Sequence, residues 1–165
     1  MMAEKKLVAI LDDDTANARG IQALLELADL EGVIFTDVAR FVRVVIMADG
    51  EQPLKDRLYG GCILDYWLFY PDGRPQGING EGVAKLLRIK RSDLVVCSVT
   101  SDAPEEHFKE VGLVQERFPK AIILGNPPRV FRAFLNFVGR MGGSPDKITE
   151  IIEAPAVQPV VVYAT

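Results

Sequence analysis

The sequence predicts an α/β fold in which a parallel five-stranded sheet carries helices on both faces. Short apolar runs alternate along the chain with segments whose apolar residues recur at helical spacing. Five runs of each kind follow one another, as expected for a sheet wound with helices. The strand runs are almost continuously apolar, which is typical of parallel strands buried on both faces.

The predicted strands are short apolar runs between polar or turn-forming residues. They are Leu7–Leu11, Val33–Phe35, Cys62–Leu64, Leu94–Val99 and Ala121–Leu124. The first run ends abruptly at Asp12, and the third ends at Asp65.

The predicted helices are the segments with helical spacing that follow these strands. The first two have apolar residues from Ala18 to Ala28 and from Phe41 to Ala48, and the second closes near Gly50. The others are Glu81–Ile89, Glu105–Phe118 and Pro128–Met141. Asp14 or Thr15 is the expected cap of the first helix, and Thr36 or Asp37 of the second.

The length of the chain fits one domain. Its 165 residues, 48% of them apolar, are enough to bury a sizeable core. Gly142 and Gly143 mark a break, so we expect a domain over residues 1–141 and an extension over 142–165. The extension has a helix candidate with Pro145 in its first turn and a strand-like run, Val160–Tyr163, and we expect it to pack on the domain or on a partner.

The composition excludes several classes of protein. The net charge of −4 argues against a nucleic-acid binder that works by bulk electrostatics. No apolar run approaches the ~20 residues of a membrane span, so a cytoplasmic protein is expected. Two cysteines, Cys62 and Cys97, are too few for a disulfide scaffold, and we expect them to lie near each other as buried thiols.

Polar side chains gather where the predicted strands end, which is where chemistry collects in open parallel sheets. These residues are Asp12, Asp13, Asp65, Thr100, Ser101 and Asn126. Three converging carboxylates repel one another unless a cation offsets them. Oxygen ligands of high charge density suit Mg²⁺, so the sequence predicts a magnesium site here.

The layout resembles the response-regulator receiver domain of two-component signalling. The resemblance is carried by LVAILDDD, CILD and VVCSVTSD, each at a predicted strand end and in the family's order, and it covers about residues 5–141. It implies a flavodoxin-like sheet with the strand order 2-1-3-4-5. It also implies a stand-alone signalling module that is not an enzyme and acts through protein contacts.

The resemblance assigns roles to residues. Asp65 corresponds to the aspartate that accepts a phosphoryl group from a histidine kinase or phosphotransfer protein. Asp13, Asp65 and the main-chain carbonyl of Trp67 would bind Mg²⁺, with Asp12 acting through a water.

Two further positions would contact the phosphoryl group in that family-like arrangement. The hydroxyl of Thr100 would donate to one of its oxygens, and the main-chain N–H of Ser101 to another.

The sequence departs from the family at the expected end of strand five. The family's lysine there is replaced by Asn126, followed by Pro127, and Ile123 stands where an aromatic switch residue is usual. The loop from Asp65 to Gly80 is also longer. A receiver without the lysine would accept phosphate slowly or not at all, so a degenerate receiver is a second interpretation.

The alternative enzyme is a phosphohydrolase of the haloacid-dehalogenase type. Asp12 and Asp14 have its aspartate spacing, but Thr15 comes one position early and Asp65 has no role in it.

Further expectations concern surfaces and contacts. The apolar residues from Val130 to Met141 suggest a homodimer through the fourth and fifth predicted helices. A downstream protein partner is expected as well. His107, the only histidine, is expected on the surface of a helical turn. The aromatic run Tyr66–Tyr70 is either a lid over the site or packing beneath a loop.

Overall fold

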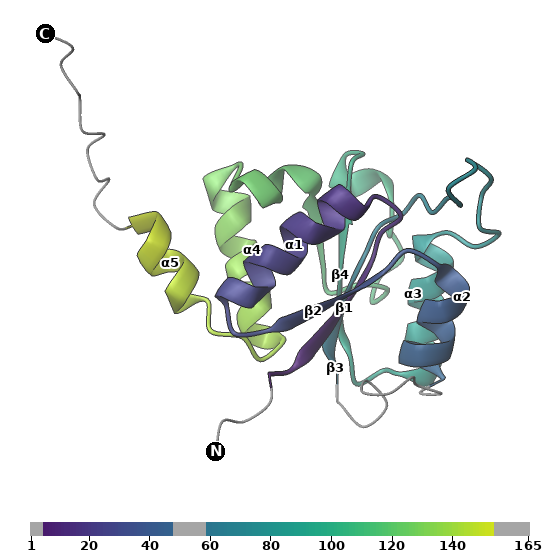
Figure 1. Ribbon diagram of the computed structural model, residues 1–165, viewed down its shortest axis with the longest axis horizontal. Helices are drawn as coiled ribbons and strands as arrows, with labels where there is room; N and C mark the ends of the chain where they lie inside the picture. Colours follow the sequence, from purple (N-terminus) through teal and green to yellow (C-terminus); the bar gives the residue numbers. More distant parts are fainter. Residues whose placement is uncertain (1–4, 48–58, 154–165) are drawn as a thin grey trace, which may run out of the picture.

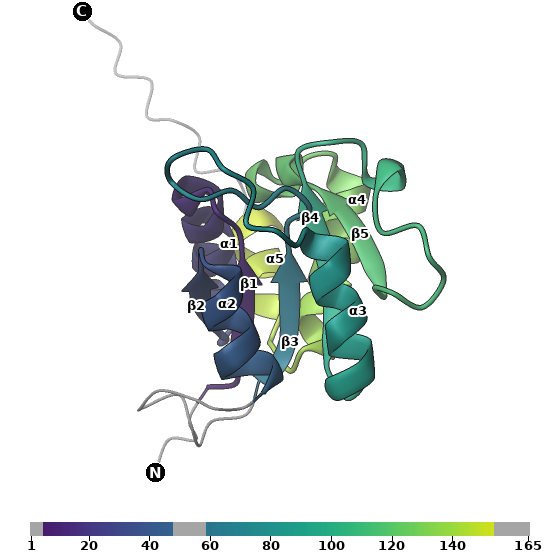
Figure 2. The same cartoon turned by 90° about the vertical axis from the view of Figure 1, so that its right-hand side faces the viewer.

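The computed structural model describes residues 5–47 and 59–153, with side chains up to Glu150. Its centre is a five-stranded sheet with the order β2-β1-β3-β4-β5, in which every neighbouring pair is parallel (Figure 2). The strands are β1 (Leu7–Leu11), β2 (Glu31–Phe35), β3 (Tyr59–Leu64), β4 (Val95–Thr100) and β5 (Glu116–Pro119). The predicted parallel α/β fold and its flavodoxin-like strand order are confirmed.

Helices cover both faces of the sheet. They are α1 (Thr15–Leu27), α2 (Val38–Phe41), the π-helix η1 (Val42–Ile46), α3 (Gly80–Lys90), the 3₁₀-helices η3 (Pro104–Glu106) and η4 (Lys120–Leu124), α4 (Pro128–Arg140) and α5 (Asp146–Glu153). In Figure 1, α1 and α4 lie on one face and α2 and α3 on the other. The predicted end of the second helix, beyond Met47, lies outside the described residues.

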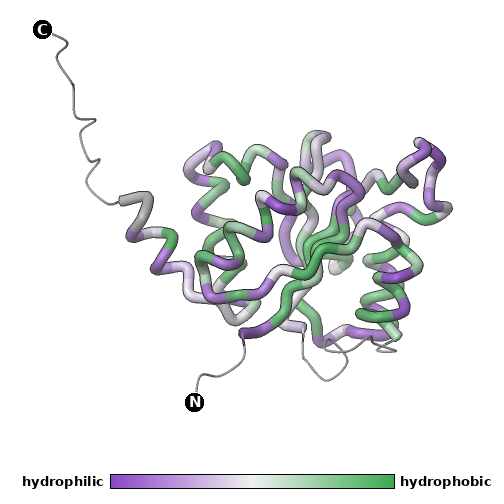
Figure 3. The backbone as a smooth tube through the Cα atoms, viewed as in Figure 1, coloured by the Kyte–Doolittle hydropathy of each residue, from purple (hydrophilic) through white to green (hydrophobic). Residues whose placement is uncertain are grey.

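The core forms on both faces because β1 is apolar throughout. Leu7, Ala9 and Leu11 pack with α2 and α3. Val8 and Ile10 pack with α1 and α4. All five are fully buried, and Figure 3 shows the strands as the hydrophobic centre of the molecule. This arrangement accounts for the uninterrupted apolar runs of the central strands.

Side-chain caps set the helix starts directly after the strands. The Asp14 carboxylate accepts from the N–H groups of Ala16 and Asn17 at the start of α1. Asp37 and Asn79 cap α2 and α3 in the same way. A cap stabilises a helix by about 1 kcal/mol, and here it also fixes how the chain leaves the sheet.

The predicted helix Glu105–Phe118 is wrong. Only Pro104–Glu106 is helical there, as a 3₁₀ turn. Phe108 and Gly112 have φ of +57° and +81°, which an α-helix cannot accommodate. The side chain of Arg88 instead holds this segment by donating to the Leu113 carbonyl and to the Gln115 side chain.

The predicted fifth strand is also wrong in its position. Ala121–Leu124 lies within the 3₁₀-helix η4, and β5 comes earlier. Because β5 is an edge strand, it buries Phe118 but exposes Glu116 and Arg117. A short edge strand with charged residues therefore lacks the continuous apolar run that marks the central strands.

The two cysteines lie on opposite faces of the sheet. Both are buried and free, as predicted. Cys97 pairs in register with Ile63, so Cys62 points into the α2–α3 side and Cys97 into the α1–α4 side. The two residues are neighbours on adjacent strands, as expected, but their thiols point to opposite faces because alternate residues of a strand face opposite ways.

The extension begins by packing on α1. The Ser144 N–H donates to the Ala28 carbonyl, Lys147 lies 2.6 Å from Asp29, and Ile148 is buried. The strand-like run Val160–Tyr163 lies outside the described residues.

The aromatic face of α4 is covered within the chain. Phe131, Phe134 and Phe137 are buried, and Phe118 of β5 meets Phe134 edge-on at 5.4 Å. The fourth predicted helix does not form, and the apolar residues of α4 are covered within the chain. The two observations that suggested a homodimer are therefore gone, and the homodimer stays a prediction.

No helix in residues 5–47 and 59–153 has the length and apolar character that crossing a membrane requires.

Candidate functional site

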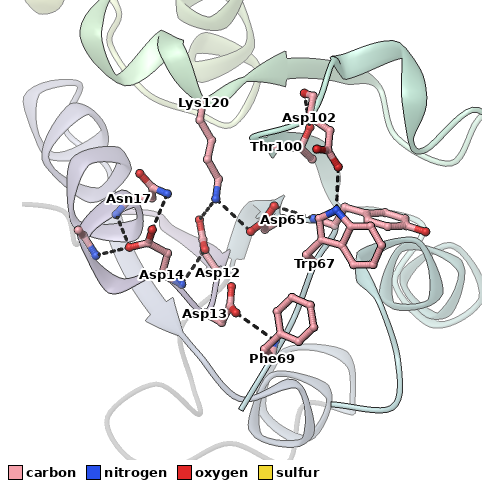
Figure 4. Close-up of polar contacts among 12 residues, drawn as sticks. Asp12, Asp13, Asp14, Asn17, Asp65, Trp67, Phe69, Thr100, Asp102 and Lys120 are labelled. Atoms are coloured by element: carbon pink, nitrogen blue, oxygen red, sulfur yellow. Dashed lines mark hydrogen bonds and ion pairs between the residues drawn. The ribbon is translucent and has the colours of Figure 1, made fainter. Parts of the chain in front are cut away.

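Three carboxylates meet at the carboxyl ends of β1 and β3. The Asp12 N–H continues the ladder to Phe35, and the Asp65 N–H continues it to Leu11. Asp12 is 1% exposed and Asp65 4%, while Asp13 is half-buried nearer the solvent. Oxygen atoms of the three acids lie within 4.8 Å of one another (Figure 4). The structure thus brings together the three acids that the sequence predicted to converge.

Lys120 completes this acidic cluster. It directly follows β5, and its Nζ lies 3.2 Å from Asp65 Oδ2 and 3.7 Å from Asp12 Oδ2. Lys120 is not among the predicted site residues because the fifth strand is predicted after it, at Ala121–Leu124. The residue at the carboxyl end of strand five is therefore Lys120, and the assignment of that position to Asn126 is wrong.

Asn126 stands two residues before the start of α4 rather than at the end of β5. Its side chain is exposed, its N–H donates to the Ala121 carbonyl, and its peptide bond to Pro127 is cis. The expected switch position also moves: the residue three before Lys120 is the exposed Arg117, not Ile123. The interpretation as a degenerate receiver rested on a missing lysine, and the position of Lys120 removes that reason for it.

Burial dominates the electrostatics of the cluster. Desolvation, reinforced by the charge of Asp65, raises the pKa of Asp12 to about 7. Desolvation also raises the pKa of Asp65, against the lowering effect of Lys120. Burial opposes the charge on Lys120, but Asp12 and Asp65 outweigh it and raise the pKa of the ammonium group. The lysine is thus held charged between two acids that burial disfavours as anions.

The donor set fits a hard divalent cation. Among the described residues, Asp12 Oδ2 is buried without a hydrogen-bond partner, and Lys120 stands at ion-pair distance only. Asp13 Oδ2 accepts from the Phe69 N–H at 3.0 Å, which leaves its second oxygen for another partner. Carboxylate oxygens in this number suit Mg²⁺, which keeps part of its water shell.

Thr100 and Ser101 lie at the end of β4. Thr100 is buried, and its hydroxyl donates to the main-chain carbonyl of Asp102 at 3.2 Å. Ser101 is exposed in the turn that follows. The carboxyl ends of three neighbouring strands therefore supply Asp12, Asp65 and Thr100.

Gly80 lets α3 approach Asp65. A Cβ on Gly80 would overlap the main-chain oxygen of Asp65. The Gly80 N–H donates to the Tyr66 carbonyl, and the Tyr66 N–H donates to Asp65 Oδ1. The start of α3 thus helps to fix the backbone at the acid.

The long loop between Asp65 and α3 is ordered by the side chain of Gln76. Its Nε2 donates to the carbonyls of Thr36 and Phe69, and its Oε1 accepts from the Val38 N–H. Leu68 is buried, whereas its aromatic neighbours are half-exposed at the rim of the cluster. The residue that packs beneath the loop is Leu68, whereas the rings of Trp67 and Phe69 lie beside the cluster, so the role of a lid stays a prediction.

His107 contacts this loop, which the sequence did not predict. Its ring stacks on Tyr66 with the centroids 3.6 Å apart, and its Nε2 lies 2.7 Å from Asp102 Oδ2. The same carboxylate oxygen accepts from the indole N–H of Trp67 at 2.7 Å. The hydrogen bond to His107, followed by that to Trp67, lowers the pKa of Asp102. His107 is half-buried rather than a surface residue of a helix.

Among the comparisons with known proteins, the solved structures agree on the fold. No family model and no curated protein matches the chain. A sensor protein from Polaromonas sp. JS666 is 22% identical with a TM-score of 0.55, over 80% of this chain and 98% of that one. A CheY-like response regulator receiver domain protein from Methanospirillum hungatei JF-1 is 16% identical with a TM-score of 0.58, over 84% and 97%.

A third solved structure carries a ligand. The response regulator TrrA from Thermotoga maritima, in complex with Mg²⁺ and BeF, is 17% identical with a TM-score of 0.59, over 80% of this chain and 98% of that one. At these identities the likeness establishes the fold. The chain has the fold of response-regulator receiver domains, as the sequence resemblance implied.

Proposed function

We propose that the protein acts as a signalling receiver whose Asp65 accepts a phosphoryl group from a phosphohistidine. The donor would be a histidine kinase or a phosphotransfer protein, and the output would be contact with a downstream protein. The observation that carries this proposal is the arrangement of Asp65 with Lys120, Asp12 and Asp13 at adjoining strand ends. It is supported by the receiver fold of the chain.

The mechanism needs few protein groups, because phosphoryl transfer depends mainly on positioning and charge. Asp65 Oδ2, now held by Lys120, would attack the phosphorus in line with the departing nitrogen. The ammonium group of Lys120 would then move its hydrogen bond to a phosphoryl oxygen. The hydroxyl of Thr100 could rotate from the Asp102 carbonyl to another, and the Ser101 N–H would donate to the same group.

Mg²⁺ is the cofactor that the acids fit. Asp13, Asp65 and the Trp67 carbonyl would bind it, and Asp12 would act through a water. When bound, the ion would neutralise the charge of the transferring phosphoryl group.

The phosphohydrolase alternative gains no support from the geometry. It requires Asp14 as an acid beside Asp12, but the Asp14 carboxylate is exposed and caps α1. A generic phosphatase assay is therefore expected to show no turnover.

Incubation with Mg²⁺ and phosphoramidate tests the acceptor. Intact mass should show one added phosphoryl group on the native protein and none on Asp65→Asn. Asp72→Asn is the matched control, since Asp72 is an exposed acid of the same loop paired with Arg74. An adduct that survives Asp65→Asn would place the acceptor elsewhere and overturn the proposal.

Magnesium should stabilise the native protein. A ligand that binds only the folded state at tenfold excess over Kd adds about 1.4 kcal/mol to the free energy of unfolding. We expect millimolar Mg²⁺ to raise the melting temperature of the native protein but not of Asp13→Ala. Asp14→Ala, which loses only the α1 cap, should melt lower yet keep the response to Mg²⁺. An unchanged response in Asp13→Ala would remove Asp13 from the metal site.

A further inference from the structure

An apolar groove of about 550 Å³ lies between η4, α4 and the start of α5. Phe131 and Leu135 of α4 form its buried part, and Pro145 lines it from the side of α5. Leu124, which also lines the groove, is 80% exposed. Exposed apolar surface that gathers in one place commonly marks a contact site.

The groove is formed before any occupant arrives, because α5 is anchored on α1. The Ser144 N–H donates to the Ala28 carbonyl at 2.7 Å, and Ile148 is buried. In Figure 1, α5 stands at the edge of the molecule beside α4. Asp146 and Thr149 of the anchored helix line the groove. An occupant therefore binds without having to order the walls, which keeps the entropic cost low.

The polar residues of the groove favour an occupant without charge. Arg132 and Asp146 line it with opposite charges, and both are exposed. The other polar side chains of the lining, Asn136 and Thr149, are uncharged. An acidic or a basic peptide would be attracted by one of the two charged residues and repelled by the other. A neutral, apolar segment therefore suits the groove best.

We propose that residues 159–163 of the same chain occupy this groove. Residues 154–165 carry no charged side chain, and residues 159–163 are a proline, three valines and a tyrosine. Pro155 and Pro159 restrict the backbone at two positions, so less conformational freedom is lost when the segment docks. This inference concerns the extension and does not depend on phosphorylation of Asp65.

The chain is long enough to return to the groove. The eight residues of α5 end at Glu153 and make a helix about 12 Å long. The groove lies along the first half of that helix, at Asp146 and Thr149. Residues 154–158 can span about 16 Å when extended, which is enough to run back along α5. A tethered segment also has an effective concentration of about a millimolar, so a modest affinity is sufficient.

A nitroxide label on α4 tests the occupant in the full chain. Ala133→Cys places the label at an exposed position of α4 that does not line the groove. Cys62 and Cys97 are fully buried and burial raises the pKa of both thiols, so they should not take the label. The methyl NMR signals of valines 160–162 should lose most of their intensity relative to the reduced label. A label at Ile89→Cys, on α3 at the other face of the sheet, should leave them unchanged.

A substitution at the groove separates docking from mere proximity. Leu124→Asp adds a charge to the apolar lining, and because this side chain is 80% exposed the core should not be disturbed. When combined with the label at Ala133→Cys, it should restore most of the lost intensity. Val111→Asp is the matched control, since Val111 is 99% exposed in the segment before β5, and it should leave the broadening as it is.

Three results would overturn the proposal. Valine signals that keep their intensity with the label at Ala133→Cys would show that the segment does not approach α4. Broadening that persists in Leu124→Asp would show that the segment lies near α4 but outside the groove. Broadening of isotope-labelled chains by added nitroxide-labelled chains at natural isotope abundance would make a second copy of the chain the occupant instead.

Discussion

Replacement of Lys120 by methionine is expected to slow phosphorylation of Asp65 by about 100-fold or more, the usual cost of removing one group that stabilises a developing anion. The ammonium group lies 3.2 Å from Asp65 Oδ2, where the phosphoryl group would be attached. A methionine side chain has similar length but carries no charge and donates no hydrogen bond. A time course of intact mass with phosphoramidate and Mg²⁺ measures the rate.

The same variant should also melt at a lower temperature without metal, because Asp12 and Asp65 lose the cation between them. Mg²⁺ should restore more stability to Lys120→Met than to the native protein. Lys147→Met is the control, since its amine pairs with Asp29 at the distant α5. Phosphorylation of Lys120→Met at the native rate would show that the lysine does not act on the phosphoryl group.

The central strands were predictable because both of their faces are buried. Every residue of β1 lies in the core, so an uninterrupted apolar run marked it, and the aspartate that ended the run marked its carboxyl end. The same reasoning located β3 and Asp65. It failed at β5, where Phe118 is buried but Glu116 and Arg117 face solvent. An edge strand whose charged residues face solvent has no continuous hydrophobic run to mark it in the sequence.

That single error in register explains the missed lysine. With the strand predicted at Ala121–Leu124, its carboxyl end lies near Asn126, and Lys120 comes before the strand. Gly112 within the predicted helix Glu105–Phe118 was the available signal, since a glycine inside a helix costs about 1 kcal/mol and often marks its end. Ending the helix there would have freed residues 116–119 for the strand.

The contacts of His107 had no signal in the sequence. Its ring lies on Tyr66 and against Asp102 because β3 and β4 are neighbours, and the loops that follow them meet above the sheet. Strand ends are visible in a sequence, but the paths of the loops beyond them depend on packing. The acids and Thr100 were therefore found, whereas the network around Asp102 was not.

In metal-free buffer with EDTA, the free energy of unfolding is expected to fall as the pH rises from about 4 to about 7, by up to about 1.4 kcal/mol per pH unit from Asp12. The pKa of Asp12 is raised from 3.8 to about 7, mainly by burial and then by the charge of Asp65. Between these values the folded protein keeps a proton that the unfolded chain has released. The contribution of Asp12 to the free energy of unfolding is therefore fully present below the lower pKa and is lost as the pH rises through the higher one.

Urea unfolding at several pH values measures this slope, with Asp12→Asn as the comparison. Asparagine has the same shape and does not ionise, so the variant should lose the fall and exceed the native stability above pH 7 in EDTA. Saturating Mg²⁺ should flatten the native curve, because a bound cation favours the ionised carboxylates. Lys120 faces Asp12 and lowers its pKa, so Lys120→Met should extend the fall to higher pH. Parallel curves for the native protein and Asp12→Asn in EDTA would show that Asp12 is already ionised throughout this range, with Lys120 and water outweighing its burial.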